Sequence, residues 1–177
     1  MEILIVGIIV VALMVVVSTK IKKSAAQAFE REEIEADDFS LVKPAGFIHP
    51  LNEDSDFAFE AYTNDFGEEE EAKNFRRSRA TLRVISNSDF ETICRNAKNI
   101  ADKILSKRFV EDTPAGQKIF LLENEKSEAG VKLFTRWKIV ESRERRKIYE
   151  FQISVLEDYF EDYEDRASEM VASFDVK

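Results

Sequence analysis

Residues 118–156 decide the fold, and they read KIFLLENEKSEAGVKLFTRWKIVESRERRKIYEFQISVL. Apolar and polar side chains alternate through residues 131–140 and again through residues 148–156, which is the period of a strand with one buried face. Residues 118–123 form a third apolar run, and only short polar stretches separate the three runs. Because short links join strands that pair with their sequence neighbours, the pattern predicts a three-stranded antiparallel meander.

Elements on either side extend this meander into a larger sheet with helices. Residues 57–62 and 79–85 have the aromatic content or the alternation of two further strands. Ser88 with Glu91 three residues later resembles a capping box, and apolar residues recur at helical spacing from there to Leu105. Residues 160–174 show the same helical spacing at the end of the chain. The order of elements predicts an α+β fold, an antiparallel sheet covered by helices in an α/β/α sandwich.

The N-terminus carries the strongest signal for location. Residues 3–17 read ILIVGIIVVALMVVV without a polar side chain. From Ile3 to Thr19 a helix would measure about 25 Å, which is short but sufficient for a bilayer core of about 30 Å. A secretory signal peptide would need a basic start and a small-residue cleavage site, and neither is present. The segment is therefore predicted to be an uncleaved single transmembrane helix that anchors the protein in the bilayer.

The flanks of this segment predict the orientation and the domain organisation. Lys20, Lys22 and Lys23 follow the span, so the positive-inside rule places the body of the protein on the cytoplasmic face. Residues 24–38 (SAAQAFEREEIEADD) favour a helix with few apolar anchors. We therefore expect a transmembrane anchor over residues 1–20, a juxtamembrane helix or stalk over residues 21–39, and an α+β globular domain over residues 40–177.

Over residues 47–174 the order of elements resembles the fold shared by PsbP-type proteins and the Ran-binding import factors related to them. The resemblance rests on the strands at 57–62 and 79–85 before a long helix, on the meander 118–156, and on the closing pattern from Tyr163 to Met170-Val171-Ala172-Ser173-Phe174. It implies a non-enzymatic accessory or binding protein, because the known relatives are mostly of that kind. Soluble or lumenal relatives reach their compartment by a cleaved peptide or a lipid anchor, whereas this chain is predicted to keep a membrane helix.

The residue inventory leaves little room for catalysis or for a metal centre. The chain has one Cys and one His, which excludes a multi-cysteine zinc site and a two-histidine metal site. His49 has no catalytic partner in the sequence and is interpreted as a loop or strand-edge residue. Cys94 lies on the apolar face of the predicted helix and is interpreted as buried. We therefore expect no catalytic residue, no metal and no cofactor.

Charge is unevenly distributed along the chain. The formal net charge is −9, which argues against a nucleic-acid partner. Basic residues nevertheless gather at the predicted hairpin tip and near the start of an earlier strand, and we take them as candidate contacts for a partner or for lipid: Arg143, Arg145, Arg146, Lys147, Arg76 and Arg77. A mixed-charge surface with internal salt bridges is the alternative interpretation.

These features favour a membrane-anchored, non-catalytic accessory or assembly subunit whose domain docks on a larger membrane protein complex. One alternative is a peripheral lipid-binding or adaptor module that uses the basic hairpin, since basic residues near an anionic leaflet contribute about 1 kcal/mol each. A membrane-bound enzyme, such as a hydrolase using His49, is the third hypothesis.

Overall fold

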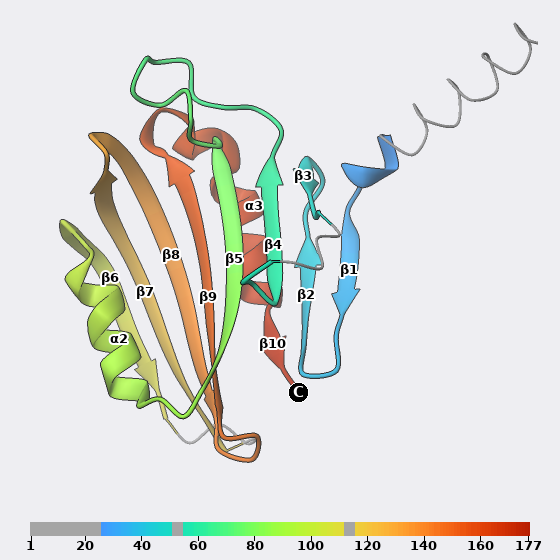
Figure 1. Cartoon of the computed structure of the whole chain (residues 1–177), viewed down its shortest axis with the longest axis vertical. Coiled ribbons are helices and arrows are strands. Elements are labelled where there is room, and N and C mark those ends of the chain that lie inside the picture. The colour runs from blue at the N-terminus through green and yellow to red at the C-terminus, as the bar shows by residue number, and fades with distance from the viewer. Residues whose placement is uncertain (1–25, 51–54, 112–115) are drawn as a thin grey trace, which may run out of the picture.

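A computed structural model describes residues 26–50, 55–111 and 116–177 (Figure 1). Its main feature is a seven-stranded antiparallel sheet with the strand order β3-β4-β5-β9-β8-β7-β6, accompanied by a three-stranded sheet with the order β1-β2-β10. The strands of the large sheet are β3 (Phe47–Ile48), β4 (Phe59–Thr63), β5 (Ser78–Ser86), β6 (Lys103–Val110), β7 (Gln117–Glu128), β8 (Val131–Ser142) and β9 (Lys147–Leu156). The remaining elements are β1 (Glu32–Glu35), β2 (Phe39–Lys43), α2 (Phe90–Asn99), η1 (Glu157–Tyr159), α3 (Phe160–Ser173) and β10 (Asp175–Val176).

The meander predicted from the sequence is confirmed as β7-β8-β9. In β9 the buried Phe151 and Ile153 alternate with the half-buried Gln152, as a strand with one core face requires. In β8 Trp137 and Ile139 are buried on the opposite face of the sheet. The two faces therefore bury different cores, and each attracts its own helix.

The helices lie on opposite faces of the large sheet, with α2 in front and α3 behind in Figure 1. Helix α3 buries Tyr163, Ala167 and Met170 in the main core, to which the small sheet also contributes. Helix α2 buries Phe90 and Cys94 against β7 and β8 in a smaller core. The layer order predicted from the sequence is thus present, with an additional small sheet beside α3.

The long helix predicted from Ser88 to Leu105 is wrong in its second half. Helix α2 ends at Asn99, and the following residues turn into the edge strand β6. Its N-cap is Asp89 rather than Ser88, because a side-chain oxygen of Asp89 accepts the backbone N–H of Thr92 at 2.8 Å. The exposed edge of β7 offers backbone hydrogen bonds to residues 103–110, and this pairing prevails over their helical spacing.

The helix predicted over residues 24–38 is also wrong in its second part. Of the described residues 26–38, only 26–28 are helical, and Glu32–Glu35 forms β1, paired in register with β2. The ammonium of Lys43 on β2 donates to the carbonyl oxygens of Ala28, Glu30 and Phe47 at 3.0, 2.6 and 2.9 Å, which fastens this segment to the domain. The division into anchor, stalk and domain stays a prediction.

The predicted membrane span over residues 3–19 lies outside the described residues, as do Lys20, Lys22 and Lys23. Within the described ranges, every helix is too short or too polar to cross a bilayer.

Candidate functional site

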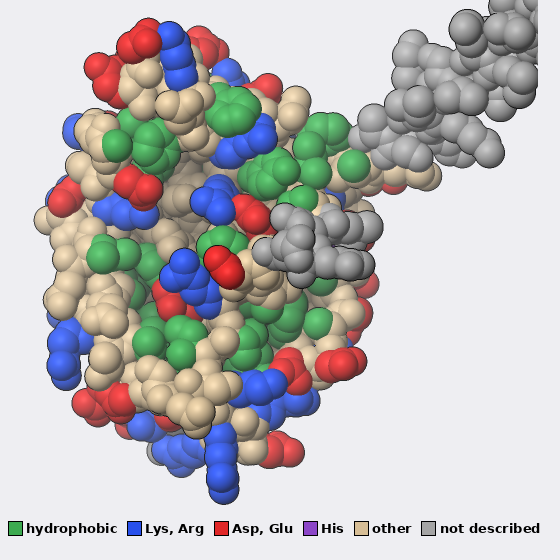
Figure 2. All heavy atoms as spheres, viewed as in Figure 1, with side chains coloured by type: hydrophobic (Ala, Val, Ile, Leu, Met, Phe, Trp, Pro, Cys, Tyr) green, Lys and Arg blue, Asp and Glu red, His purple; other side chains and the backbone are tan. Residues whose placement is uncertain are grey.

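The face of the large sheet that carries α2 is only partly covered by it. Antiparallel register places Thr81 of β5 beside Gln152 of β9 on one side and Glu60 of β4 on the other. Beyond α2 these strands line a groove of about 600 Å³, which we call the open groove. Figure 2 shows this face, with cationic, acidic and hydrophobic side chains interspersed over its middle. The open groove is defined by Phe57, Glu60, Tyr62, Phe66, Asn74, Phe75, Arg76, Arg79, Thr81, Arg83, Lys126, Glu128, Leu133, Glu150, Gln152 and Ser154.

Aromatic rings hold Arg76 at one end of the open groove. The Arg76 guanidinium lies 4.5 Å from the ring centroid of Tyr62 and 3.9 Å from that of Phe66. Its Nη1 also donates to the carbonyl oxygen of Asn64 at 2.6 Å. A guanidinium held over two rings keeps its remaining N–H groups in a fixed plane. Arg76 is therefore positioned in advance for a planar acceptor such as a carboxylate.

Two further arginines of β5 share a single ring. The guanidinium groups of Arg79 and Arg83 lie 5.5 and 5.0 Å from the centroid of Phe57. Arg79 forms an ion pair with Glu60 at 2.8 Å. Among the described residues no carboxylate lies within ion-pair distance of Arg83, which is exposed. The open groove therefore contains one neutralised and one available guanidinium on the same strand.

Glu150 lies beside Arg83 in the cross-strand register of β5 and β9. Burial raises the pKa of the Glu150 carboxyl, and the nearby positive charge of Arg83 opposes this only in part. The floor of the open groove therefore holds a carboxylate that is unfavourably desolvated. A partner that donated a hydrogen bond to Glu150 would stabilise its charged form. Within the described ranges no cluster of His, Cys, Asp or Glu has the arrangement of a metal site.

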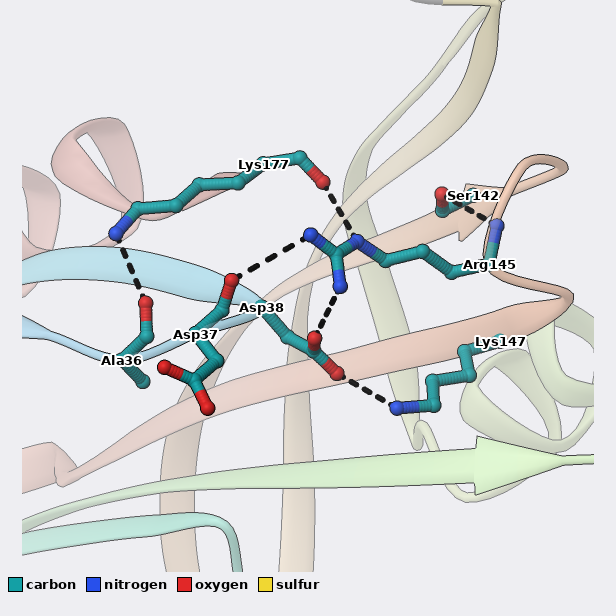
Figure 3. A network of polar contacts seen from close by, with 7 residues as sticks. All are labelled: Ala36, Asp37, Asp38, Ser142, Arg145, Lys147 and Lys177. Carbon is teal, nitrogen blue, oxygen red and sulfur yellow. Dashed lines mark hydrogen bonds and ion pairs between the residues drawn. The ribbon is translucent and has the colours of Figure 1, made fainter.

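The predicted basic hairpin is partly engaged in holding the fold together (Figure 3). Lys147 pairs with Asp38 at 2.6 Å, and Arg145 pairs with the other oxygen of the same carboxylate. Arg145 also donates to the carbonyl oxygen of Lys177 at 2.9 Å. The hydrogen bond from Lys147 lowers the pKa of Asp38. These two cations therefore fasten the turn between β1 and β2 and the C-terminal strand to the hairpin, and Arg143 and Arg146 remain exposed.

The six basic candidates do not form one surface. The backbone N–H of Leu156 donates to the carbonyl oxygen of Arg77, so Arg77 lies at the far end of β9 from Lys147. Strand β9 has 10 residues and is about 30 Å long at about 3.3 Å per residue. Arg77 itself stacks on Tyr159 at 4.2 Å and pairs with Glu68 at 2.7 Å. Only Arg76 of the six belongs to the open groove.

The two residues examined as catalytic candidates have structural contacts. His49 Nδ1 lies 2.7 Å from the carbonyl oxygen of Glu60, and its ring stacks on Phe59 at 4.9 Å. Cys94 is 1% exposed, and burial raises the pKa of its thiol to about 12. Cys94 is buried as the sequence predicted, and His49 directly follows β3, in agreement with its interpretation as a loop or strand-edge residue.

The sequence pointed to Arg76 but not to the other groove residues. Its signal was present, because Arg79, Thr81 and Arg83 form the polar face of a predicted strand. Such a face is usually solvated, and only the covering pattern of α2 shows that these residues line a concavity. The aromatic partners Phe57 and Tyr62 come from another part of the chain, so no local pattern connects them to the arginines.

The comparisons with known proteins establish the fold. No family model and no curated protein sequence matches the chain. Among solved structures, the architecture is that of the PsbP-like fold shared with a Ran-binding protein, as the resemblance predicted. Cyanobacterial PsbP from Synechocystis sp. PCC 6803 is similar with a TM-score of 0.52 and 12% identity, covering 84% of this chain and 92% of that one.

Two further structures have the same architecture. The Ran-binding protein Mog1p of Saccharomyces cerevisiae has a TM-score of 0.52 and 17% identity, with 84% of this chain and 96% of that one covered. LpqN of Mycobacterium tuberculosis, described as involved in cell envelope biogenesis, has a TM-score of 0.51 and 12% identity, with 84% and 91% covered.

Proposed function

We propose that the chain is a membrane-anchored, non-catalytic accessory or assembly subunit of a larger membrane protein complex, and that its domain docks on a partner protein through the open groove. One observation carries the proposal: the groove combines Tyr62 with Arg76, Arg79 and Arg83 on a rigid sheet. Tyrosine and arginine are the residue types that dominate binding energy at protein interfaces, particularly where rings and guanidinium groups pack together.

The direction in which the chain enters the domain supports a protein partner. Residues 26–30 lie at one end of the described structure, near the level of the loop between β4 and β5, and the hairpin 142–147 lies at the other end (Figure 1). Only residues 21–25 separate the predicted anchor from Ala26. The end bearing residues 26–30 would therefore face the bilayer, and the basic hairpin would point away from it.

This geometry weakens the lipid-binding alternative. Attraction to anionic headgroups decays within about 10 Å at ordinary ionic strength. Two of the four hairpin cations, Arg145 and Lys147, are already paired with Asp38. The loop near the predicted bilayer side carries Glu68–Glu71, which anionic lipid repels. An anchored domain with this charge distribution is better suited to a protein surface than to a bare leaflet.

The structural neighbours favour binding over catalysis. Mog1p is a Ran-binding protein. The anchor would confine the domain to the plane of the membrane and raise its effective concentration near a membrane partner, so a modest groove contact suffices.

Crosslinking in the source cells tests the proposal, followed by mild solubilisation, affinity purification of the full-length chain and mass spectrometry. We expect one membrane complex at stoichiometric yield, and about a tenfold or greater loss in Arg76→Ala/Arg83→Ala, because hot-spot truncation costs about 2 kcal/mol or more. Arg143→Ala, an exposed arginine at the other end, is the matched control and should retain the complex. A wild-type protein recovered only as a free monomer would refute the accessory role, and retention by the groove variant would place docking elsewhere.

The lipid-binding alternative has its own assay. The full-length chain in vesicles should show no protection of the hairpin 142–147 from proteolysis or hydrogen exchange when anionic lipid replaces neutral lipid. Protection of the hairpin that depends on anionic lipid would instead favour the hypothesis of a lipid-binding or adaptor module.

A further inference from the structure

Strand β6 forms one edge of the large sheet and is open to solvent. Among the described strands its one partner is β7, and every residue of Lys103–Val110 is exposed except the half-buried Val110. Alternate backbone N–H and C=O groups of an edge strand point away from the sheet, so β6 offers hydrogen-bonding groups that a further strand can use.

The side chains along this edge are unusually apolar for an exposed strand. Ile104, Leu105 and Phe109 are 41%, 45% and 51% exposed, and Ile100 just before them is 48% exposed. Phe109 stacks on the buried Phe120 at 4.4 Å, so its exposed part is held in a fixed position. Large apolar side chains gathered on one edge indicate a surface that is covered by a partner.

The edge has one irregularity, which limits where a strand can pair. The register shifts between Ile104 and Ser106, so Leu105 bulges from the ladder. Beyond the bulge, residues 106–110 pair without a break with β7. A bulge blunts an edge only locally, and five regular residues remain available for pairing.

The charges on β6 indicate which chemistry fits. Lys107 and Arg108 are consecutive and therefore point to opposite faces of the sheet. Among the described residues neither has a carboxylate within ion-pair distance, whereas Lys103 pairs with Glu125 at 3.0 Å. A second copy of this chain paired antiparallel along β6 would bring these cations near one another, and like charges across a ladder are destabilising. The complementary strand is one that carries acidic side chains on both of its faces, among apolar ones.

We propose that β6 receives an extended segment of a partner protein, apolar with acidic side chains on both of its faces, as an eighth strand of the sheet. This mode of recognition uses backbone hydrogen bonds for affinity and the flanking side chains for selectivity. The site goes beyond the docking function proposed for the open groove, because no residue of β6 lines that groove.

The test uses the full-length chain in mild detergent with two capped probe peptides, VEEVEEV and VKKVKKV, whose charges lie on both faces of an extended strand. We expect the acidic peptide to slow hydrogen exchange in residues 103–110 and to leave β5 unchanged. By fluorescence anisotropy, Lys107→Glu/Arg108→Glu should weaken acidic-peptide binding about tenfold and make the lysine peptide the better ligand. Arg143→Glu/Arg146→Glu makes the same charge change on exposed residues elsewhere and should alter neither affinity.

Three outcomes would overturn the proposal. They are an acidic peptide that protects no part of β6, equal binding to wild type and the charge-reversed variant, and self-association of the chain with protection of β6 in the absence of peptide. The groove variant Arg76→Ala/Arg83→Ala separates the two sites, since it should bind the acidic peptide as wild type does while losing its membrane partner. Fluorescence of the single, buried Trp137 confirms that each variant is folded.

Discussion

Lys43 is the residue whose replacement tests most directly how the chain's first described segment is attached. Its side chain is 1% exposed, and its ammonium donates to the carbonyl oxygens of Ala28, Glu30 and Phe47. Burial lowers the pKa of this lysine, because desolvation disfavours the charged ammonium. Lys43→Met keeps most of the apolar stem and removes the charge together with all three hydrogen bonds.

The expected loss follows from what each carbonyl can do afterwards. The Phe47 oxygen is buried with its donor, and leaving it unpaired costs about 1–3 kcal/mol. The other two bonds are only partly buried, so water replaces the lysine at a cost of about 0.5–1 kcal/mol each. Methionine offsets part of this loss of stability, because the folded state of the variant no longer has to desolvate a buried cation. We expect a net destabilisation of about 2–3 kcal/mol, or roughly 5–10 °C in Tm for a domain of this size.

Urea unfolding followed by Trp137 fluorescence measures this loss, and hydrogen exchange in residues 28–35 locates it. Lys132→Met is the matched control, because Lys132 is 68% exposed and makes one surface ion pair with Glu157. We expect the control to stay within about 0.5 kcal/mol of wild type. If Lys43→Met unfolds with the same midpoint as the control, the three carbonyl bonds contribute nothing net and the reasoning fails.

Three further predictions concern buried or paired groups. Because burial raises the pKa of Glu150, the folded protein holds that proton more tightly than the unfolded chain does, so Glu150→Gln should raise Tm at neutral pH, with the gain vanishing as pH falls to about 4. A thiol pKa of about 12 leaves a thiolate fraction on the order of 10⁻⁴ near pH 8, so Ellman's reagent should label Cys94 only after denaturation, and rapid native labelling would contradict its burial. The lowered pKa of Asp38 means that its pairing with Lys147 stabilises the fold above about pH 4 and is lost as pH falls through the folded-state pKa. Asp38→Asn should therefore speed hydrogen exchange in residues 36–38 at neutral pH and have little effect in strong acid, and equal exchange at neutral pH would refute this.

The sequence predicted those elements that bury one continuous face. In β8 and β9 the alternation of Trp137 and Ile139, and of Phe151 and Ile153, requires a strand, because a helix would disperse these side chains around its axis. The same holds for α3, whose buried Tyr163 lies on the same side as the rest of its apolar stripe. Local spacing decides whether these segments form strand or helix, and their tertiary contacts favour the same secondary structure.

The failures occur where a pairing partner decides. Ile100, Ile104 and Leu105 fit a helical face, and only the free edge of β7 turns the latter two into strand. Residues 30–38 are mostly acidic with few apolar anchors, and they suggested a juxtamembrane helix or stalk. Their strand forms because β2 offers a ladder and Lys43 gathers the carbonyl oxygens before it, and neither contact has a local signature.

The open groove could not be predicted for a related reason. Arg79 and Arg83 stood in the sequence as part of an ordinary polar strand face, and only Arg76 was a candidate contact. Stacking of Arg76 on Tyr62 joins residues that are separated by a loop. The concavity exists because α2 covers only part of this face and leaves residues such as Thr81 of β5 and Gln152 of β9 uncovered. A site made by incomplete coverage of a sheet depends on the placement of a helix, which spacing alone does not give.

The two proposed surfaces place a common requirement on the partner. The open groove and the β6 edge lie at different parts of one rigid sheet, so a partner that meets both is bound at two points by contacts that are individually weak. Anchoring raises the effective concentration at which each of the two surfaces meets the partner. Loss of one surface therefore weakens the complex less than loss of the anchor, on which both contacts depend. Deletion of residues 1–20 should therefore reduce recovery of the complex more than either Arg76→Ala/Arg83→Ala or Lys107→Glu/Arg108→Glu alone, as quantitative mass spectrometry of crosslinked samples would show. Recovery that survives the deletion and is lost with one surface variant would mean that this surface binds tightly by itself and that the anchor only localises the protein.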